Sequence, residues 1–243
     1  MFPISAYRPA FASVLGFLIV ALVALAVPTT AQSERLISVY QKNMSFGITT
    51  ERKLANDILA SGADVVTLQE VNRDNDKIFA MLADKYPHKQ FCTFRGIGGV
   101  AVLSRWPIVN GQAECVRPLG VAAMRVKMPE GKVWVMSLHL ETRDKPRHAR
   151  QAEQLGNHLQ NVPGPMIIGG DFNNLPQAGS VRDVARGGRL ARIGEAITTY
   201  RVNGMLGIPI DFVFASGGRG SVTQMPLLGS DHYGVLAEFT MDF

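Results

Sequence analysis

The sequence predicts a mixed α/β or α+β domain built around a central β-sheet core. Short apolar stretches of strand character alternate along the chain with longer stretches whose apolar residues recur at helical spacing. The chain is 47% hydrophobic and 19% charged, which is typical of a globular protein and excludes a disordered one. Mixed domains of 200 to 250 residues are common, so the 243 residues predict a single folded domain.

The first thirty residues differ in composition from the rest of the chain. Residues 10–27 are an almost unbroken apolar run, and Arg8 is the only charged residue before Glu34. The small residues that follow the run predict a signal peptide at residues 1–31, cleaved after Ala31. The alternative is an N-terminal membrane anchor, because the run is just long enough to span a bilayer. In both cases we expect an exported folded part at residues 35–243, either secreted or periplasmic, or held at a membrane.

Charge and cysteine content limit the partners only loosely. The net charge of +5 and the pI of 9.4 are compatible with an anionic partner such as nucleic acid or an anionic membrane surface. Cys92 and Cys115 are the two cysteines, and outside the cytoplasm they could form a disulfide or remain two buried thiols. Two cysteines without a C-x-x-C spacing do not make a zinc site by themselves.

The elements at the start of the folded part predict a β-α-β unit. Residues 36–39 form a short apolar strand, and a helix follows with Leu54 and Ile58 on one face and Gly62 at its end. Residues 65–68 form the next apolar strand. A second helix is predicted at about residues 75–86.

The remaining elements continue this alternation. A helix with apolar residues at helical spacing follows His139, and residues 176–201 are rich in Arg, Gly and Ala and show no clear period. Strands are predicted at residues 91–94, 100–103, 122–128, 133–140, 166–168, 210–214 and 235–239.

Polar side chains recur at the ends of the apolar strands, where α/β folds place their chemistry. Carboxylates and amides are oxygen ligands for a hard cation, and imidazoles handle protons near neutral pH. The sequence has no H-E-x-x-H, no G-x-S-x-G and no Gly-rich Walker loop, which excludes the metalloprotease, serine hydrolase and P-loop classes. The strand-end residues are Asn43, Glu70, His139, Asp171, Asn173, Asp211, Asp231 and His232.

Each of these residues has an ordinary structural explanation when taken alone. A strand-end Asn is commonly a turn cap, and a His between two leucines, such as His139, is commonly a satisfied core histidine. Asp211 is harder to dismiss, because an unpaired carboxylate between Ile210 and Phe212 would be costly to bury. Three other histidines are expected at the surface: His88, His148 and His158.

Seven short motifs in a fixed order carry a resemblance to a known family. They are Asn43 after the first strand, 68–71 (LQEV), 99–105 (GVAVLSR), 137–140 (SLHL), 169–173 (GGDFN), 210–213 (IDFV) and 230–232 (SDH). In this order the chain resembles the endonuclease/exonuclease/phosphatase superfamily, to which deoxyribonuclease I and exonuclease III belong. The resemblance implies an α+β fold, a four-layered α/β/β/α sandwich with two packed mixed β-sheets, at residues 35–243.

The resemblance also implies roles for the strand-end residues. Asn43 and Glu70, joined by Asp231, resemble the family's metal site, which implies Mg²⁺ with Mn²⁺ as a possible substitute. The catalytic set comprises His139, which contacts a phosphate oxygen, Asp171 and Asn173, which handle the attacking water and the phosphate, and His232 oriented by Asp211. Whether Asp171 or His232 accepts the proton of water stays open.

These residues predict a metal-dependent hydrolase that cuts phosphodiester bonds by in-line attack of water, most simply an exported monomeric nuclease. The arginine-rich stretch at residues 179–205 could contact a nucleic acid or an anionic membrane surface. The enzyme alternative is a lipid or inositol phosphodiesterase, or a phosphatase, on the same fold. The alternative from another class is a noncatalytic binding module.

Overall fold

The computed structural model describes residues 35–46, 50–94 and 98–243. Residues Glu34–Phe243 form one compact unit. The predicted signal peptide or anchor at residues 1–31 lies outside the described residues. Across the part of the chain that the structure describes, no helix has the length and apolar character needed to cross a bilayer.

Strands are the commonest regular elements of the described unit, and helices lie between them in the chain. In chain order the elements are β1 (Ile37–Asn43), α1 (Glu51–Ser61), β2 (Val65–Val71), α2 (Ile78–Leu82), β3 (His88–Phe94), β4 (Gly98–Ser104), β5 (Ile108–Val116), the 3-10 turn η1 (Arg117–Leu119), β6 (Val121–Lys127), β7 (Lys132–His139), α3 (Lys145–Leu159), β8 (Met166–Asp171), α4 (Gly179–Gly188), β9 (Leu190–Arg192), β10 (Tyr200–Val202), β11 (Leu206–Ile208), β12 (Asp211–Ser216), β13 (Arg219–Met225) and β14 (Gly234–Thr240).

The described strands form two six-stranded sheets and one two-stranded ribbon, β10–β11. Sheet A has the order β13-β14-β1-β2-β4-β3, and sheet B has the order β5-β6-β7-β8-β12-β9. Strands β1 and β2 pair in parallel, as do β7 and β8, whereas the neighbouring pairs are antiparallel. Both sheets are therefore mixed, as the sequence predicts.

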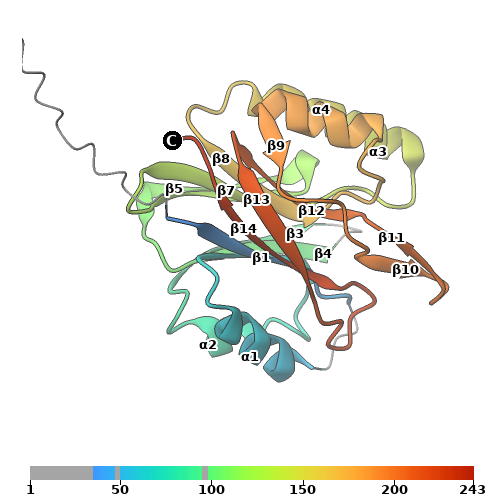
Figure 1. The fold of residues 1–243 in the computed structure, drawn as a ribbon, viewed down its shortest axis with the longest axis horizontal. Helices are drawn as coiled ribbons and strands as arrows, with labels where there is room; N and C mark the ends of the chain where they lie inside the picture. Colours follow the sequence, from blue (N-terminus) through green and yellow to red (C-terminus); the bar gives the residue numbers. More distant parts are fainter. Residues whose placement is uncertain (1–34, 47–49, 95–97) are drawn as a thin grey trace, which may run out of the picture. The chain divides into compact units, whose positions relative to one another are not determined.

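The two sheets pack face to face between two helical layers (Figure 1). Val39, Val65 and Val135 belong to the apolar core between the sheets. Helices α1 and α2 cover the outer face of sheet A, while α3 and α4 cover the outer face of sheet B. This is the four-layered α/β/β/α sandwich that the resemblance implies.

The alternation of side chains along β2 shows how the sequence produces these layers. Val65 packs between the sheets, and Val66 packs against the helices on the outer face of sheet A. Thr67 points inward again and lies against Gly169 of β8, where an added Cβ would come within 2.4 Å of its hydroxyl oxygen. A glycine at position 169 therefore allows the two sheets to approach closely near the ends of β2 and β8.

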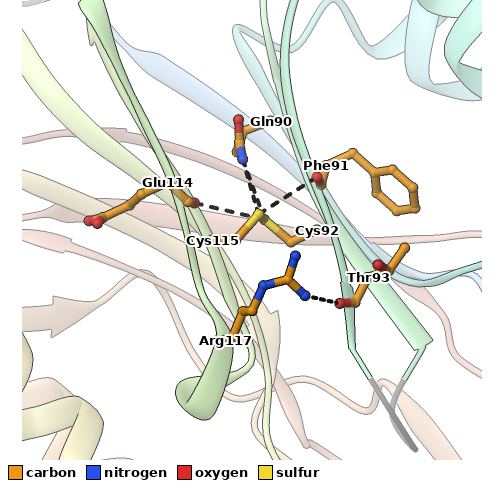
Figure 2. Close-up of a disulfide and its surroundings, with 7 residues drawn as sticks. All are labelled: Gln90, Phe91, Cys92, Thr93, Glu114, Cys115 and Arg117. Atoms are coloured by element: carbon orange, nitrogen blue, oxygen red, sulfur yellow. Dashed lines mark hydrogen bonds between the residues drawn. A yellow bond between two sulfur atoms is a disulfide. The ribbon is translucent and has the colours of Figure 1, made fainter.

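A disulfide between Cys92 and Cys115 links the two sheets (Figure 2). Cys92 lies in β3 at the edge of sheet A, and Cys115 lies in β5 at the edge of sheet B. The sequence left open whether these cysteines pair, and the structure shows that they do, closing a loop across 23 residues of sequence separation.

Some element boundaries differ from the sequence predictions. The helix predicted at residues 75–86 is shorter and comprises only α2, because the Asn72 and Asn75 side chains hold residues 72–75 in a turn. Strand β1 continues past residue 39 to Asn43. Edge strands β5 and β13 were not predicted, since their alternation is weak and most of their side chains are exposed or half-buried.

Candidate active site

The predicted site residues lie on several strands that end at the same edge of the sandwich. Asn43 is the last residue of β1, and Glu70 is near the end of β2. His139 and Asp171 end the parallel strands β7 and β8 and face each other in register. Asp211 begins β12, antiparallel to β8, and is paired with Asp171. Residues far apart in the chain are thus brought together by strand order alone.

A β-bulge gives Glu70 its orientation. The pairing of β2 with β4 shifts register between Leu68 and Val71, and Glu70 has a positive φ of 55°. Leu68 and Val71 both pack under the helices of sheet A, although they are three residues apart. The extra residue of the bulge accounts for this spacing, because in a regular strand Glu70 would share the face of Leu68. The strained backbone instead turns its carboxylate toward the site.

Asn43 connects two carboxylates at the centre of the site. Its Nδ2 donates to Glu70 Oε1 at 3.2 Å and to Asp171 Oδ2 at 3.0 Å. Its Oδ1 accepts a hydrogen bond from the Ser45 backbone, and the Phe46 backbone donates to the other Glu70 oxygen at 3.2 Å. The loop after β1 therefore fixes both Asn43 and Glu70.

Asp171 is a buried acid with a strongly shifted pKa. Its side chain is 1% exposed, and burial raises its pKa to about 7, with the nearby Asp211 charge acting in the same direction. Hydrogen bonds from the Asn173 backbone at 2.8 Å and from Asn43 oppose the shift. A carboxyl with this pKa can exchange a proton near neutral pH.

Asp211 and His232 form a buried pair. His232 Nδ1 lies 2.8 Å from Asp211 Oδ2. Burial alone would lower the pKa of His232, but the Asp211 carboxylate outweighs burial and raises it to about 10. Burial would likewise raise the pKa of Asp211, yet the positive imidazole and its hydrogen bond bring it below its ordinary value. At neutral pH the pair is therefore an imidazolium held by a carboxylate, with Nε2 directed toward Asp171 Oδ2 at 3.8 Å.

His139 and Asn173 complete the same cluster. His139 Nε2 lies 3.6 Å from Asp171 Oδ2 and 3.9 Å from Glu70 Oε1, and its side chain is buried. Asn173 has a positive φ of 49°, and its Nδ2 donates to the Leu140 carbonyl at 3.0 Å. Asn173 thus ties the loop after β8 to the loop after β7.

Asp231 is placed differently from the other predicted residues. It is exposed, whereas the adjacent His232 is buried. In the described residues, no hydrogen bond or ion pair joins Asp231 to Asn43 or Glu70. A second group of side chains that could hold a metal ion is more buried than Asp231. It comprises Asp171, Asp211 and His232, whose ligand atoms lie within 4.8 Å of one another. Since Asp211 and His232 already bond to each other, Glu70 with Asn43 remains our predicted metal site, and a metal role for Asp231 stays a prediction.

A buried hydrogen-bond network supports Asp211 from inside the sandwich. Gln41 Nε2 donates to Asp211 Oδ1 at 3.0 Å and to Gln69 Oε1 at 2.7 Å. Gln69 in turn donates to Ser137 Oγ of the other sheet at 3.0 Å. Thr199 Oγ1 accepts from the Asp211 backbone. Sequence reasoning did not assign these roles, although polar residues inside apolar strands were a usable signal.

Lys42 is a second residue that sequence reasoning missed. It is completely buried beside Asn43, and its Nζ donates to the carbonyls of Pro226, Leu227 and His232 at 3.0, 2.8 and 2.5 Å. Burial lowers its pKa to about 8. The ammonium group thereby holds the loop that carries His232 against β1.

The prediction that His148 lies at the surface is wrong. His148 is 7% exposed and lies between α3 and α4. Its Nδ1 donates to the Glu141 carbonyl at 2.6 Å, which leaves Nε2 to accept from Ser180 Oγ at 3.0 Å. Paired polar partners on two elements make burial of this imidazole favourable, and periodicity alone does not reveal such partners.

The four-layered sandwich, with carboxylates, amides and imidazoles gathered at one edge, is the arrangement that the resemblance in the sequence implies. The chain belongs to the Endonuclease/Exonuclease/phosphatase family, which matches residues 41–232. This confirms the resemblance found in the sequence. No curated protein matches the chain.

Solved structures of the same fold include the following three proteins. TDP2 from D. rerio, complexed with a single-strand DNA product, has a TM-score of 0.68 at 17% identity, covering 85% of this chain and 99% of that one. Sphingomyelinase C from Streptomyces griseocarneus has a TM-score of 0.61 at 22% identity, covering 84% and 99%. Beta toxin from Staphylococcus aureus, an F277A, P278A mutant with bound magnesium ions, has a TM-score of 0.63 at 15% identity, covering 85% and 99%. These likenesses show the fold alone.

Proposed function

We propose that the protein hydrolyses phosphodiester bonds of nucleic acid, using water and a divalent metal ion. The observation that carries this proposal is the convergence of Asn43, Glu70, His139, Asp171 and the Asp211–His232 pair at one edge of the sandwich. Phosphoryl transfer needs mainly positioning and charge neutralisation, and this cluster contains groups suited to both.

The donor set fits a hard divalent cation. Glu70 offers carboxylate oxygens of the kind that Mg²⁺ and Mn²⁺ prefer, and Asn43 would contribute Oδ1, which here accepts from the Ser45 backbone while Nδ2 faces Glu70 and Asp171. The two cysteines are joined in a disulfide, so they offer no thiolate ligand. Burial raises the pKa of Glu70 as well as that of Asp171, so this region holds carboxylates that a nearby positive charge would stabilise. A bound ion would supply Lewis-acid polarisation of the phosphoryl group. The magnesium-bound beta toxin supports the choice of metal.

The shifted pKa values support one choice of proton acceptor. The Asp211 carboxylate raises the pKa of His232 to about 10, which favours its imidazolium form at neutral pH and makes it the poorer acceptor of a proton from water. Asp171, with a pKa of about 7, can accept it. Water attacks phosphorus, its proton passes to Asp171, and the ester P–O bond breaks. The departing oxygen takes a proton from solvent, and the His232 Nε2–H group and His139 stabilise the charge of the phosphoryl oxygens.

The assay for this function uses plasmid DNA, single-stranded DNA and RNA with the purified protein. We expect cleavage in Mg²⁺ and none in excess EDTA, with activity restored by added Mg²⁺ or Mn²⁺. Support for nucleic acid comes from the net charge of +5 and from the DNA product bound in TDP2. If all three nucleic acids stay intact in both metals, the nuclease proposal is wrong.

The second candidate function is a lipid phosphodiesterase, favoured by the β10–β11 ribbon. This ribbon extends from the body of the sandwich (Figure 1), and it exposes 84% of Met205 and 65% of Leu206 beside Arg201. An apolar tip with an adjacent cation is suited to a membrane surface. Release of phosphorylated headgroups from sphingomyelin or phosphoinositide vesicles, together with intact nucleic acid, would favour this function.

We further propose that the protein is exported by a signal peptide at residues 1–31 and acts as a monomer. The Cys92–Cys115 disulfide supports export, because disulfides persist mainly outside the cytoplasm. N-terminal sequencing of the protein from cell fractions should give a mature chain that starts at Gln32. An intact N-terminus in the membrane fraction would favour an anchor instead. Light scattering should give the mass of one chain.

A further inference from the structure

A cavity of about 720 Å³ lies next to the candidate active site. Its walls come from the end of β3, from η1 and from the start of α3. Three arginines line it, Arg117 from η1 and Arg147 and Arg150 from α3. Pockets of this size hold small ligands or a few units of a polymer. We call it the arginine cavity.

The charge of the arginine cavity is positive on balance, because three arginines and one carboxylate line it. None of the three arginines forms a salt bridge with any residue in the described ranges. Glu141 is the single carboxylate in the lining, and its Oε1 accepts hydrogen bonds from the backbone of Thr142 and Arg143 at 3.1 and 3.0 Å. Arg117 Nη1 donates to the Thr93 carbonyl at 3.4 Å, which holds the guanidinium between β3 and η1 (Figure 2).

Short backbone connections join the cavity wall to the catalytic edge. The Gly120 carbonyl, in the cavity lining, accepts a hydrogen bond from the His139 backbone at 3.0 Å. Glu141 follows His139 by two residues, and the intervening Leu140 carbonyl accepts from Asn173. A substrate held at His139 and Asp171 would therefore have its adjoining part beside the arginine cavity.

The three arginines of the cavity favour a ligand that carries several phosphates. A nucleic-acid strand carries a phosphate on each nucleotide, so a scissile phosphate at the catalytic edge brings further phosphates with it. Guanidinium groups bind such phosphates through paired hydrogen bonds. A phosphocholine headgroup would instead bring a quaternary ammonium, which three arginines repel.

We propose that the arginine cavity binds phosphates of the nucleotides that adjoin the scissile bond of a nucleic-acid strand. This rests on the proposed function and narrows it, because it makes the number of phosphates in the substrate a determinant of affinity. Arg117, Arg147 and Arg150 act in binding and do not touch the reacting atoms.

The test compares two triple variants with the parent protein. The cavity variant carries Arg117→Gln, Arg147→Gln and Arg150→Gln. The matched control carries Lys127→Gln, Lys132→Gln and Arg219→Gln, which remove three exposed positive charges from strand ends away from the catalytic edge. Thermal unfolding of each variant establishes that it folds.

Two substrates separate binding in the cavity from catalysis. A ten-nucleotide single strand offers many phosphates, and bis(p-nitrophenyl) phosphate offers one. On the oligonucleotide, we expect kcat/KM of the cavity variant to fall by about 10- to 100-fold, mainly through a higher KM. On the small diester, the fold-loss in kcat/KM should be at least ten times smaller. The slope of log K for oligonucleotide binding against log salt concentration should become less steep by about 0.7 for each phosphate that the protein no longer neutralises. The control variant should match the parent. Equal losses on both substrates, or no loss on the oligonucleotide, would overturn the proposal.

A binding measurement keeps this inference separate from the proposed function. Fluorescence anisotropy with a labelled oligonucleotide needs no turnover, so it applies even if the protein cleaves nothing. Weaker binding by the cavity variant alone supports the arginine cavity as a phosphate site. Unchanged oligonucleotide binding overturns it, and so does a loss confined to phosphoinositide vesicles, which would assign the cavity to an anionic lipid.

Discussion

The two β-α-β units of the molecule are built alike but contribute different chemistry. In sheet A, β1 and β2 are parallel and α1 lies between them in sequence; in sheet B, β7 and β8 are parallel and α3 lies between them. The first unit ends in Asn43 and Glu70, which are oxygen donors. The second ends in His139 and Asp171, to which we assign charge stabilisation and proton transfer in the proposed reaction. One local rule, polar residues at the ends of parallel strands, thus produces both parts of the site.

Exposure separates the two units further. The Glu70 side chain is 17% exposed, whereas those of His139 and Asp171 are each 1% exposed. A hydrated cation can approach the first unit, while the second lies in a dry environment that raises the pKa of Asp171. The comparison therefore supports our proposal that the sheet A unit binds the metal and that the sheet B unit transfers the proton.

The largest effect should come from Glu70→Gln, which removes the charge of the sheet A unit. Loss of metal stabilisation is worth several kcal/mol, so kcat/KM in Mg²⁺ should fall by on the order of 10³-fold. Calorimetric titration should show loss of Mg²⁺ binding with the fold retained. Glu153→Gln, at an exposed position of α3, is the matched control and should behave as the parent. Metal-dependent activity within tenfold of the parent would remove the metal assignment.

Asp211→Asn should have the second largest effect on activity, because it removes the negative charge of the partner of His232 while keeping the shape of that side chain. We expect kcat to fall by on the order of 10²- to 10⁴-fold, as in other carboxylate–imidazole pairs. The pKa of His232, about 10 in the parent, should move down toward the ordinary histidine value. An NMR titration of His232 and the pH–rate profile measure these changes. An unaltered titration and rate would contradict the role of the pair.

The pH dependence of stability should distinguish Asp171 from the buried pair. The folded pKa of Asp171 is raised to about 7, so without metal the protein should lose stability as pH rises from about 4 to 7. The raised pKa of His232 contributes stability that is full below about 6.5 and is lost as pH rises through about 10. The lowered pKa of Asp211 acts oppositely, and its contribution is lost only in acid.

Thermal unfolding in EDTA across pH 4 to 11 measures these contributions. Asp171→Asn should reduce the loss of stability between about pH 4 and 7, leaving the part due to Glu70, whose pKa is also raised by burial, and it should leave the loss at higher pH in place. Added Mg²⁺ should raise the melting temperature of the parent most near neutral pH, where Asp171 becomes charged. A parent whose stability rises from pH 4 to 7 in EDTA would contradict the raised pKa.

A smaller effect, on stability, is expected for Lys42→Met. The change keeps the volume but leaves the carbonyls of Pro226, Leu227 and His232 without their shared donor. Unpaired buried polar groups cost about 1–3 kcal/mol each, and water entering the loop should limit the total loss to about 4 kcal/mol. Urea unfolding measures it, with Lys53→Met at an exposed position of α1 as control. Equal stability of the two variants would show that Lys42 does not hold the loop.

The sequence predicts the interior of each sheet better than its edges. Residues 65–68 and 133–140 are apolar because helices or the other sheet cover them, and those strands are found where expected. Strands β5 and β13 are exposed along much of their length, so their residues carry little pattern. Helix α4 was also missed, since its glycines weaken the helical signal and pack closely against α3.

The site was predictable by residue type and order, but not in its supporting contacts. Glu70 and Asp171 each have an ordinary structural explanation when taken alone, and the order of the seven motifs along the chain is what led to them. The depth of Lys42 and the exposure of Asp231 depend on the loop at residues 226–232, whose path is set by contacts between distant segments. No spacing in the sequence reports such contacts.

The β-bulge in β2 also shows how a protein can change its chemistry without rebuilding its interior. In an uninterrupted strand, the direction of every side chain follows from that of its neighbours, so no single position can be redirected alone. The additional residue frees Glu70 from this dependence, while Leu68 and Val71 keep their places beneath the helices. Deleting Gln69 would restore the regular strand and place the Glu70 side chain on the face opposite Leu68, between the two sheets and out of its present orientation. Selection on the reaction and selection on the core can therefore act on neighbouring residues independently.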